Sequence, residues 1–302
     1  MRPTGSQVTI THGVQTATIT EVGANLREYV VDGVPVVEGF AEDVLPDYCR
    51  NQVCYPWINR VGGPWEFSHR HATPNVDDVP HATANHGLAR WRPFEIDHVG
   101  TASCTLSLVL HPLPDYPFLT KLTITYALAD DGLSIHSKVE NLDDVVIPFS
   151  YGFHPYFGVT TKNLDGATLS IPAEAYVAVD DRQLPTGDFP SVSGTKFDFR
   201  RSALLNAKAL DVTYAQLTTN EDGWFTCSLQ DANGVAIEIS QDAHFPYLQI
   251  FTGDHLPEGW NRTSVAIEPM TSPPDALRSG VDLVTLSPGA TWEGTWRITR
   301  IQ

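Results

Sequence analysis

The sequence predicts an all-β fold, a large antiparallel β-sandwich with few short helices. Apolar and polar residues alternate with a period of two in several stretches, most clearly in LTITYAL (122–128) and LSIHSKV (133–139). The 22 glycines and 22 prolines are spread along the chain, as expected for many short strands joined by turns. Helical spacing of apolar residues rarely continues beyond two turns. Two packed antiparallel sheets account for all three observations.

The two clearest strands form a predicted hairpin, because ADDG (129–132) between them is a turn signal. The residues predicted to share a face are Leu122, Ile124, Tyr126 and Leu128 in the first strand and Leu133, Ile135 and Val139 in the second. Further strands are predicted in GVAIEIS (234–240), YLQIFTG (247–253) and TWRITRI (295–301). The best helical candidate is one short turn around SALLNA (202–207).

The composition describes a folded, acidic protein. Its 302 residues are predicted to form a single domain (1–302), since sandwiches often exceed the usual domain length. Hydrophobic residues make up 42% of the chain, enough for a full core. The net charge of -17 repels phosphate backbones and anionic lipids, so no nucleic-acid or membrane partner is expected. A small neutral substrate fits better, with the protein as a monomer or homodimer.

The N-terminal sequence and the cysteines both suggest a cytoplasmic protein. The first fifteen residues lack the apolar run of a secretion signal, and no stretch approaches about 18 consecutive apolar residues. The four cysteines (Cys49, Cys54, Cys104, Cys227) have no C-x-x-C spacing and are scattered. We expect them to be reduced and mostly buried in the core.

Motifs for several enzyme classes are missing. The chain contains no G-x-S-x-G, G-x-G-x-x-G, Walker loop or H-E-x-x-H, so acid–base chemistry is favoured. A metal site near His69, His71, His81 and His86 was considered, because imidazoles two apart on a strand face the same way. No cysteine or carboxylate spacing completes a tetrahedral set there, so no metal is expected.

YGFHPYFGV (151–159) places His154 among aromatic residues and before Pro155. The proline favours an extended backbone, and the aromatic rings would partly desolvate and orient the imidazole. A histidine held in this way is prepared to donate or accept a proton. A structural core histidine is an equally acceptable interpretation of this stretch alone.

Two carboxylates are further candidates. In VAIEPMTSPPDAL (265–277), Glu268 ends an apolar strand just before Pro269, where it is a plausible general base or a strand-terminal surface residue. Asp211 in ALDVTYAQL (209–217) has the pattern of a turn residue between elements.

Two polar clusters complete the set of candidates. Asn59 and Arg60 follow an aromatic–proline run and precede a double glycine in YPWINRVGG (55–63). His86 precedes Gly87 in ANHGLARW (84–91), and this glycine would let the backbone bend close to a ligand. A solvated arginine and an ordinary turn histidine are the alternative interpretations.

Taken in order, NRVGG, NHG, the stretch 116–141, PFSYGFHPYF, LD and IEP resemble the aldose 1-epimerase (galactose mutarotase) family, from about residue 15 to the end. The family pattern has a glycine–arginine pair before NR and a double glycine after the first histidine. Here YPWI and GL stand in those places, so the resemblance is to a divergent branch.

The resemblance implies a cofactor-free β-sandwich enzyme that interconverts the α and β anomers of a free aldose by ring opening and reclosure. His154 corresponds to the general acid that protonates the ring oxygen, and Glu268 to the general base that takes the proton of the anomeric hydroxyl. The corresponding sugar-binding residues are Asn59, Arg60, His86 and Asp211.

Two other functions stay open at this point. A glycoside hydrolase would use Glu268 and Asp211 as its two carboxylates, but it would leave His154 without a role. A non-catalytic carbohydrate-binding protein of the same fold would keep the pocket without activity. Relatives acting on hexose 6-phosphates would need basic residues in the pocket. The candidates are Arg27, Arg50, Arg90 and Arg92, and the net acidity of the chain argues against such a substrate.

Overall fold

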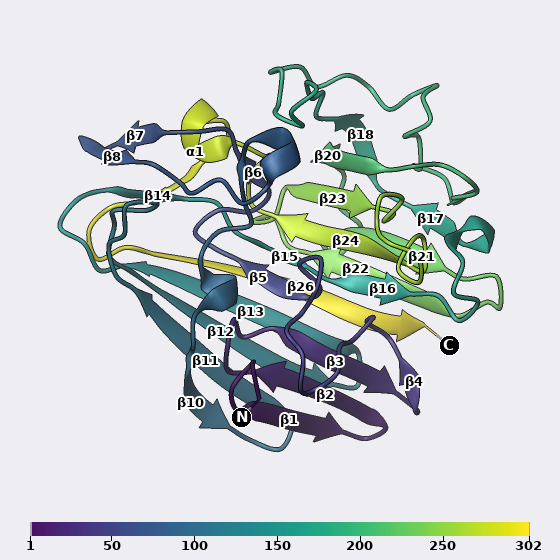
Figure 1. The fold of residues 1–302 in the computed structure, drawn as a ribbon. Helices are drawn as coiled ribbons and strands as arrows, with labels where there is room; N and C mark the ends of the chain where they lie inside the picture. The colour runs from purple at the N-terminus through teal and green to yellow at the C-terminus, as the bar shows by residue number, and fades with distance from the viewer. Residues whose placement is uncertain (1, 302) are drawn as a thin grey trace.

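The computed structural model describes residues 2–301 and consists mainly of two large antiparallel sheets (Figure 1), which confirms the predicted fold class. The nine-stranded sheet has the order β10 (Glu95–Val99), β11 (Ser103–Leu110), β12 (Thr120–Ala129), β13 (Gly132–Asn141), β26 (Thr291–Ile301), β22 (Ala236–Gln241), β21 (Phe225–Gln230), β17 (Thr168–Ser170) and β19 (Ala203–Leu204). The seven-stranded sheet has the order β18 (Ala173–Tyr176), β20 (Asp211–Leu217), β23 (Tyr247–Phe251), β24 (Ser264–Met270), β15 (Gly152–His154) and β5 (Gln52–Cys54), with β16 (Tyr156–Gly158) also paired to β24.

Smaller sheets complete the fold. The N-terminal sheet contains β1 (Gln7–His12), β2 (Gln15–Thr20), β3 (Leu26–Val31) and β4 (Val34–Pro35) and lies near β11 and β12 (Figure 1). The two-stranded pairs are β14 (Ile147–Phe149) with β25 (Val284–Leu286), β6 (Arg60–Val61) with β9 (Ala84–Asn85), and β7 (Trp65–Phe67) with β8 (Arg70–Ala72).

Helices contribute little to the described chain, and their positions correct one prediction. The α-helix is α1 (Ala276–Ser279), and single 3₁₀ turns cover η1 (Val79–His81), η2 (Ala89–Trp91) and η3 (Leu164–Gly166). The helical assignment around 202–207 is wrong, because Ala203–Leu204 pairs with β17 as β19 and the residues after it form an isolated turn. Within residues 2–301, no helix has the length and apolar character needed to cross a membrane.

The predicted hairpin is confirmed as β12 and β13, joined by Asp130 and Asp131. Residues on one face of each strand are buried and those on the other face are partly exposed, as the alternation predicted. Gly132 begins the second strand at φ 120°, and a Cβ there would lie 2.2 Å from the carbonyl oxygen of Ile298. Only glycine allows β26 to pack this closely against the hairpin.

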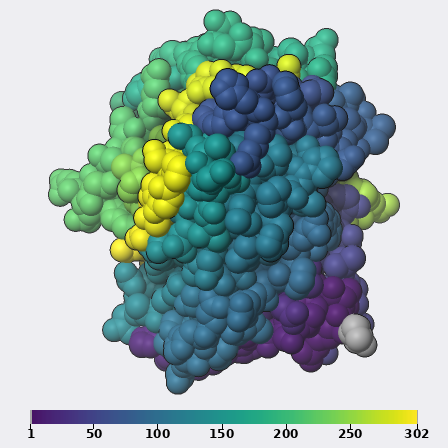
Figure 2. Space-filling model, turned by 90° about the vertical axis from the view of Figure 1, so that its left-hand side faces the viewer, coloured from purple at the N-terminus to yellow at the C-terminus, as the bar shows by residue number. Residues whose placement is uncertain are grey.

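The two large sheets pack face to face. Phe153 of β15 contacts Trp296 of β26, with ring centroids 5.1 Å apart. The Tyr151 hydroxyl bonds with Ser137 Oγ of β13 at 2.7 Å. In Figure 2, the C-terminal part of the chain (yellow) lies between later segments (green) and the middle and earlier ones (teal to blue). The seven-stranded sheet therefore has one face in the core and the opposite face free for a site.

Substitution of a buried hairpin residue should destabilise the protein strongly. Ile124 has no exposed surface, and Ile124→Ala leaves a cavity between the sheets. We expect the free energy of unfolding, measured with urea, to fall by about 2–5 kcal/mol. Thr123→Ala, on the partly exposed face of the same strand, should stay within about 0.5 kcal/mol of wild type. Equal effects of the two substitutions would contradict the observed orientation of β12.

Candidate active site

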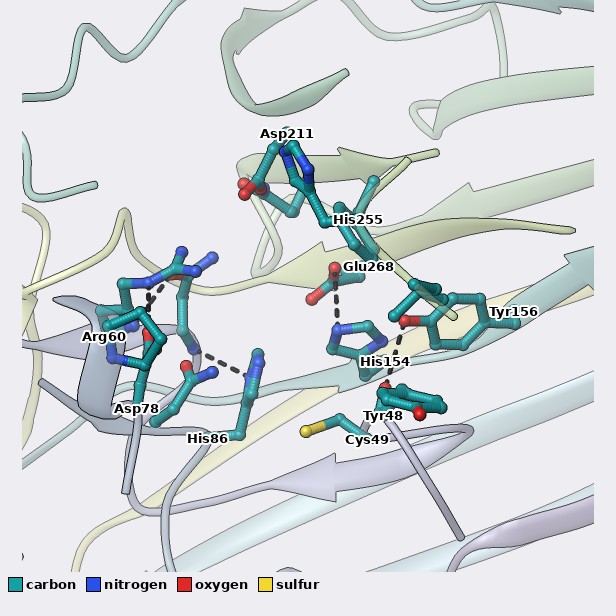
Figure 3. A pocket seen from close by; sticks show the side chains of 16 residues that line it. Tyr48, Cys49, Arg60, Asp78, His86, His154, Tyr156, Asp211, His255 and Glu268 are labelled. Carbon is teal, nitrogen blue, oxygen red and sulfur yellow. Dashed lines mark hydrogen bonds and ion pairs between the residues drawn. The ribbon is translucent and has the colours of Figure 1, made fainter. Parts of the chain in front are cut away.

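The outer face of the seven-stranded sheet carries the candidate catalytic residues. Because side chains alternate along a strand, Phe153 points into the core and His154 to the opposite face. The same alternation separates Ile267 from Glu268 in β24. Figure 3 shows His154 and Glu268 facing each other in the middle of a pocket. The surface-glutamate alternative is wrong, because Glu268 is only 1% exposed, and His154 is a buried histidine that lines the pocket.

His154 and Glu268 form a buried pair. The distance between His154 Nε2 and Glu268 Oε1 is 3.3 Å, and the side chains are only 7% and 2% exposed. Within residues 2–301, His154 Nδ1 and Glu268 Oε2 have no hydrogen-bond partner. Both atoms are fully enclosed, and a buried polar atom without a partner is costly, so the fold holds this pair at an energetic cost.

Burial decides where the proton of this pair resides. Desolvation, with a further contribution from the nearby Asp211, raises the pKa of Glu268 well above its usual value. Desolvation also lowers the pKa of His154 to about 3. Both shifts favour uncharged groups. The favoured state therefore has a protonated Glu268 carboxyl beside a neutral His154 imidazole.

His86 stands beside His154 as a neutral hydrogen-bond donor. The backbone N–H of Asn59 donates to His86 Nδ1 at 3.3 Å, so the proton of the neutral ring lies on Nε2. Burial and the neighbouring His154 lower the pKa of His86 well below its usual value. The two imidazole rings are 4.8 Å apart between centroids (Figure 3). His86 thus offers an N–H to a ligand next to the His154–Glu268 pair.

The backbone around Asn59 and His86 is tightly constrained. Both residues have left-handed φ angles, 60° and 56°, an uncommon state for residues other than glycine and one often found at functional sites. Gly87 was expected to let the backbone approach a ligand. It instead allows contact with another backbone segment, since a Cβ there would lie 2.4 Å from the Tyr55 carbonyl oxygen.

Arg60 forms one side of the pocket and is half-buried and paired. Its Nε donates to Asp78 Oδ2 at 2.8 Å, and its Nη1 lies 3.4 Å from Asn59 Oδ1. Asp78 also bonds with His81 Nδ1 at 2.9 Å. The β6 strand is held by Asp275, whose backbone N–H donates to the Arg60 carbonyl and whose carboxylate accepts from the Gly62 N–H. The positive charge of Arg60 is therefore largely balanced within the protein.

Asp211 lies at the opposite side of the pocket, in a strand rather than in the predicted turn. It begins β20, because the chain there pairs with β23 opposite Phe251. Its Oδ1 accepts a hydrogen bond from Gln249 Nε2 at 2.6 Å, and Gln249 accepts one from the Thr213 hydroxyl. Burial raises the pKa of Asp211. This network aligns an acceptor oxygen beside Glu268.

All six predicted site residues line one cavity of about 420 Å³. The sequence interpretation missed ten other lining residues: Tyr48, Cys49, Asp78, Pro80, Asn85, Tyr156, Gln249, Phe251, His255 and Leu256. Gln249 had a detectable signal, as a polar residue inside the apolar strand YLQIFTG. Asp78 had none, since only the fold brings it to Arg60. Cys54, Cys104 and Cys227 are buried as expected, whereas Cys49 is half-buried at the pocket, and all four cysteines are free.

The histidines considered for a metal site do not come together as a ligand set. The strand β8 begins at Arg70, so His69 lies outside it in a left-handed turn, which corrects the expectation of two imidazoles on one strand face. His71 Nδ1 lies 3.3 Å from Glu66. Across residues 2–301, no group of three or more histidine, cysteine, aspartate or glutamate side chains is arranged to hold a metal ion.

Comparison with known proteins identifies the family of this chain. Residues 6–299 match the protein family described as aldose 1-epimerase. The chain belongs to the aldose 1-epimerase family. The uncharacterized protein YihR of Escherichia coli K12 is 28% identical over 291 residues, which cover 96% of this chain and 91% of that protein. The galactose mutarotase of Homo sapiens is 25% identical over 151 residues, covering 47% and 43% of the two chains.

A solved structure supports the fold. The GalM/aldose epimerase homologue from C. elegans superposes with a TM-score of 0.84 at 21% identity, covering 98% of this chain and 99% of that one. As in any aldose 1-epimerase family member, substrate identity then depends on the individual pocket.

Burial of Glu268 should make stability depend on pH. Between the unfolded pKa, about 4.3, and its raised folded value, the folded state holds a proton that the unfolded state has released. The contribution of this carboxyl to stability is therefore lost as pH rises through this range. In wild type, the neutral folded imidazole of His154 offsets that loss up to about pH 6.5. We expect the free energy of unfolding of Glu268→Gln to rise relative to that of wild type by about 1.4 kcal/mol per pH unit, until pH passes the folded pKa of Glu268.

Urea unfolding from about pH 5 to about pH 8 measures this difference. The matched control is Glu95→Gln, at an exposed position of β10, which should follow wild type at every pH. A Glu268→Gln effect that is the same at all pH values would show that the carboxyl is not held protonated by burial.

Proposed function

We propose that the protein is a mutarotase that interconverts the α and β anomers of a free, unphosphorylated aldose. The observation that carries this proposal is the buried His154–Glu268 pair at the bottom of the pocket. Mutarotation needs one acid and one base acting on the two oxygens of the anomeric carbon. It needs no nucleophile, metal or redox centre, so a histidine and a glutamate suffice.

The single proton of the pair accounts for the whole cycle. Ring opening starts from protonated His154 and ionised Glu268: Glu268 takes the proton of the anomeric hydroxyl, the bond from C1 to the ring oxygen breaks, and His154 protonates that oxygen. The pair is then left as neutral His154 and protonated Glu268, the state that burial favours. After rotation about C1–C2, Glu268 returns its proton to the carbonyl oxygen and His154 takes its proton back from the ring hydroxyl as the ring recloses. No proton exchange with solvent is required.

The remaining polar groups are placed to hold the sugar hydroxyls. His86 offers an N–H, Asn59 and Arg60 offer further donors, and Asp211 offers an acceptor. None of the four arginines considered for a phosphate group lines the described pocket. Arg50 instead stacks on Trp260, and Arg90 pairs with Asp77. This arrangement favours an uncharged sugar.

Anomer exchange measured by NMR on fresh α-aldoses tests the proposal, with glucose, galactose, xylose, arabinose and glucose 6-phosphate as the panel. Each proton transfer contributes a factor of about 10² to 10⁴ to the rate. Anomer exchange in Glu268→Gln and in His154→Asn should therefore be at least about 100-fold slower than in wild type. The exposed positions Glu95→Gln and His98→Asn give the same chemical changes as controls and should keep the wild-type rate.

Three outcomes would contradict the proposal. Full activity in Glu268→Gln would remove the base from the reaction. Hydrolysis of an aryl glycoside without anomer exchange would instead support the carboxylate pair Glu268 and Asp211. Sugar binding without any acceleration would support the non-catalytic carbohydrate-binding alternative.

A further inference from the structure

Asp78 is a charged residue in the wall of the pocket, and the acid–base cycle of His154 and Glu268 gives it no role. Its carboxylate and the Arg60 guanidinium are each only 14% exposed, and both line the cavity. Arg60 Nε donates to Asp78 Oδ2 at 2.8 Å (Figure 3). Among the described residues, Arg60 is the one arginine or lysine that lines this cavity. Asp78 therefore balances the permanent positive charge of the site.

The Asp78 carboxylate is held in place by its own loop. His81 Nδ1 lies 2.9 Å from Asp78 Oδ1, and the Thr83 hydroxyl donates to Asp78 Oδ2 at 3.2 Å. The backbones of Asp78 and Thr83 also pair with each other as an isolated antiparallel bridge. Burial alone would raise the pKa of Asp78, but hydrogen bonds from His81 and Arg60 outweigh burial and lower the pKa. The carboxylate thus keeps both its charge and its position.

A second arginine ties this loop to the β6 strand. Arg182 Nε donates to the His81 carbonyl at 3.0 Å. Its Nη2 donates to the carbonyls of Ala82 and Gly62, at 2.8 and 3.2 Å. The two segments that carry the ion pair are therefore joined independently of the ion pair. A substitution of similar size at Asp78 should leave both segments in place.

The ion pair also decides which atom of Arg60 can contact a sugar. Its Nε is bonded to Asp78, and its Nη1 lies 3.4 Å from Asn59 Oδ1. Within residues 2–301, Nη2 has no hydrogen-bond partner. Because the guanidinium is planar and rigid, fixing Nε and Nη1 also fixes Nη2. Asp78 thereby leaves Nη2 as the donor that Arg60 can offer in the cavity.

An unpaired arginine in such a cavity would attract anionic sugars. Guanidinium groups bind carboxylates and phosphates through pairs of parallel hydrogen bonds, and this attraction grows where water is excluded. Asp78 opposes both effects. It occupies Nε, one of the nitrogens available for a paired contact, and it places a negative charge 2.8 Å from the guanidinium. The carboxyl groups of Asp211 and Glu268 line the same cavity and add no attraction for an anion.

We propose that Asp78 is a specificity-determining residue that removes the attraction of the pocket for anionic sugars and aims Arg60 at a sugar hydroxyl. This inference rests on the proposed function, because it concerns the substrate of the same pocket. The class that Asp78 admits is the neutral aldose. Sugars that carry a carboxylate or a phosphate are the class that becomes acceptable when the charge of Asp78 is removed.

The ratio of kcat/KM for an anionic sugar to kcat/KM for glucose measures this role. The anionic sugars are glucuronate and glucose 6-phosphate, in the same anomer-exchange assay. Asp78→Asn keeps an oxygen acceptor for Arg60 but removes the charge, so the ratio should rise at least about tenfold. Asp78→Glu keeps the charge on a longer side chain and should keep the low wild-type ratio. A merely structural role of Asp78 would not separate these two variants in this way.

Two further variants complete the test. Asp78→Ala removes both the charge and the acceptor, so the ratio should rise and kcat/KM for glucose should fall about tenfold, because Arg60 is no longer aimed. It also carries the charge test if Asp78→Asn does not fold. Asp97→Asn makes the same chemical change at an exposed position of β10 and should match wild type in both quantities.

Unchanged ratios in Asp78→Asn and Asp78→Ala would overturn the role of Asp78 and leave the proposed function standing, since wild type would still exchange the anomers of glucose. An equal rise in Asp78→Glu or in Asp97→Asn would also overturn it. If wild type accelerates no sugar, the proposed function fails, and NMR titration gives the corresponding ratio of Kd values. A shift of that ratio toward the anionic sugar in Asp78→Asn would support the role of Asp78, and no shift would overturn it.

Discussion

The buried contact between His154 and Glu268 is the constraint on which the rest of the site depends. Taking an imidazole and a carboxyl out of water penalises their charged forms, so the surroundings must hold the pair with one proton. Between roughly pH 4.3 and 6.5 the unfolded chain also carries one proton on these two groups, on the imidazole. Folding therefore moves the proton from His154 to Glu268 without changing the proton count, and the ring opening proposed above would make the same net transfer.

The strands that build the core also aim the catalytic groups. In β15, Phe153 packs on Trp296 while His154 faces the pocket. In β24, Ile267 and Glu268 likewise point to opposite faces of the sheet. A register shift by one residue would exchange the two faces and bury the wrong side chain. The packing of the sandwich thus fixes the geometry of the pair, and strands position such groups more accurately than loops do.

Period-two alternation made the sheets and the β12–β13 hairpin predictable, since it reflects which face of each strand is buried. The same pattern could not reveal that Asp211 begins a strand, because a polar residue at a strand end has the sequence signature of a turn. The 202–207 segment was misjudged for a related reason: two paired residues, β19, are too few to show a period. Asp78 and Tyr48 reach the pocket through loops whose paths depend on contacts distant in sequence, such as Arg60 with Asp78 and Tyr156 with Tyr48.

Under the proposed function, selectivity follows from the polar groups that line the pocket rather than from net charge. His86 would offer an N–H and Asp211 an acceptor oxygen to the sugar hydroxyls. An analogue lacking a hydroxyl would leave a buried polar group unpaired, at a cost of about 1–3 kcal/mol. The charge of Arg60, already balanced by Asp78, adds little attraction for an anion. Under the proposed function, the pocket therefore discriminates between sugars by hydroxyl position rather than by charge.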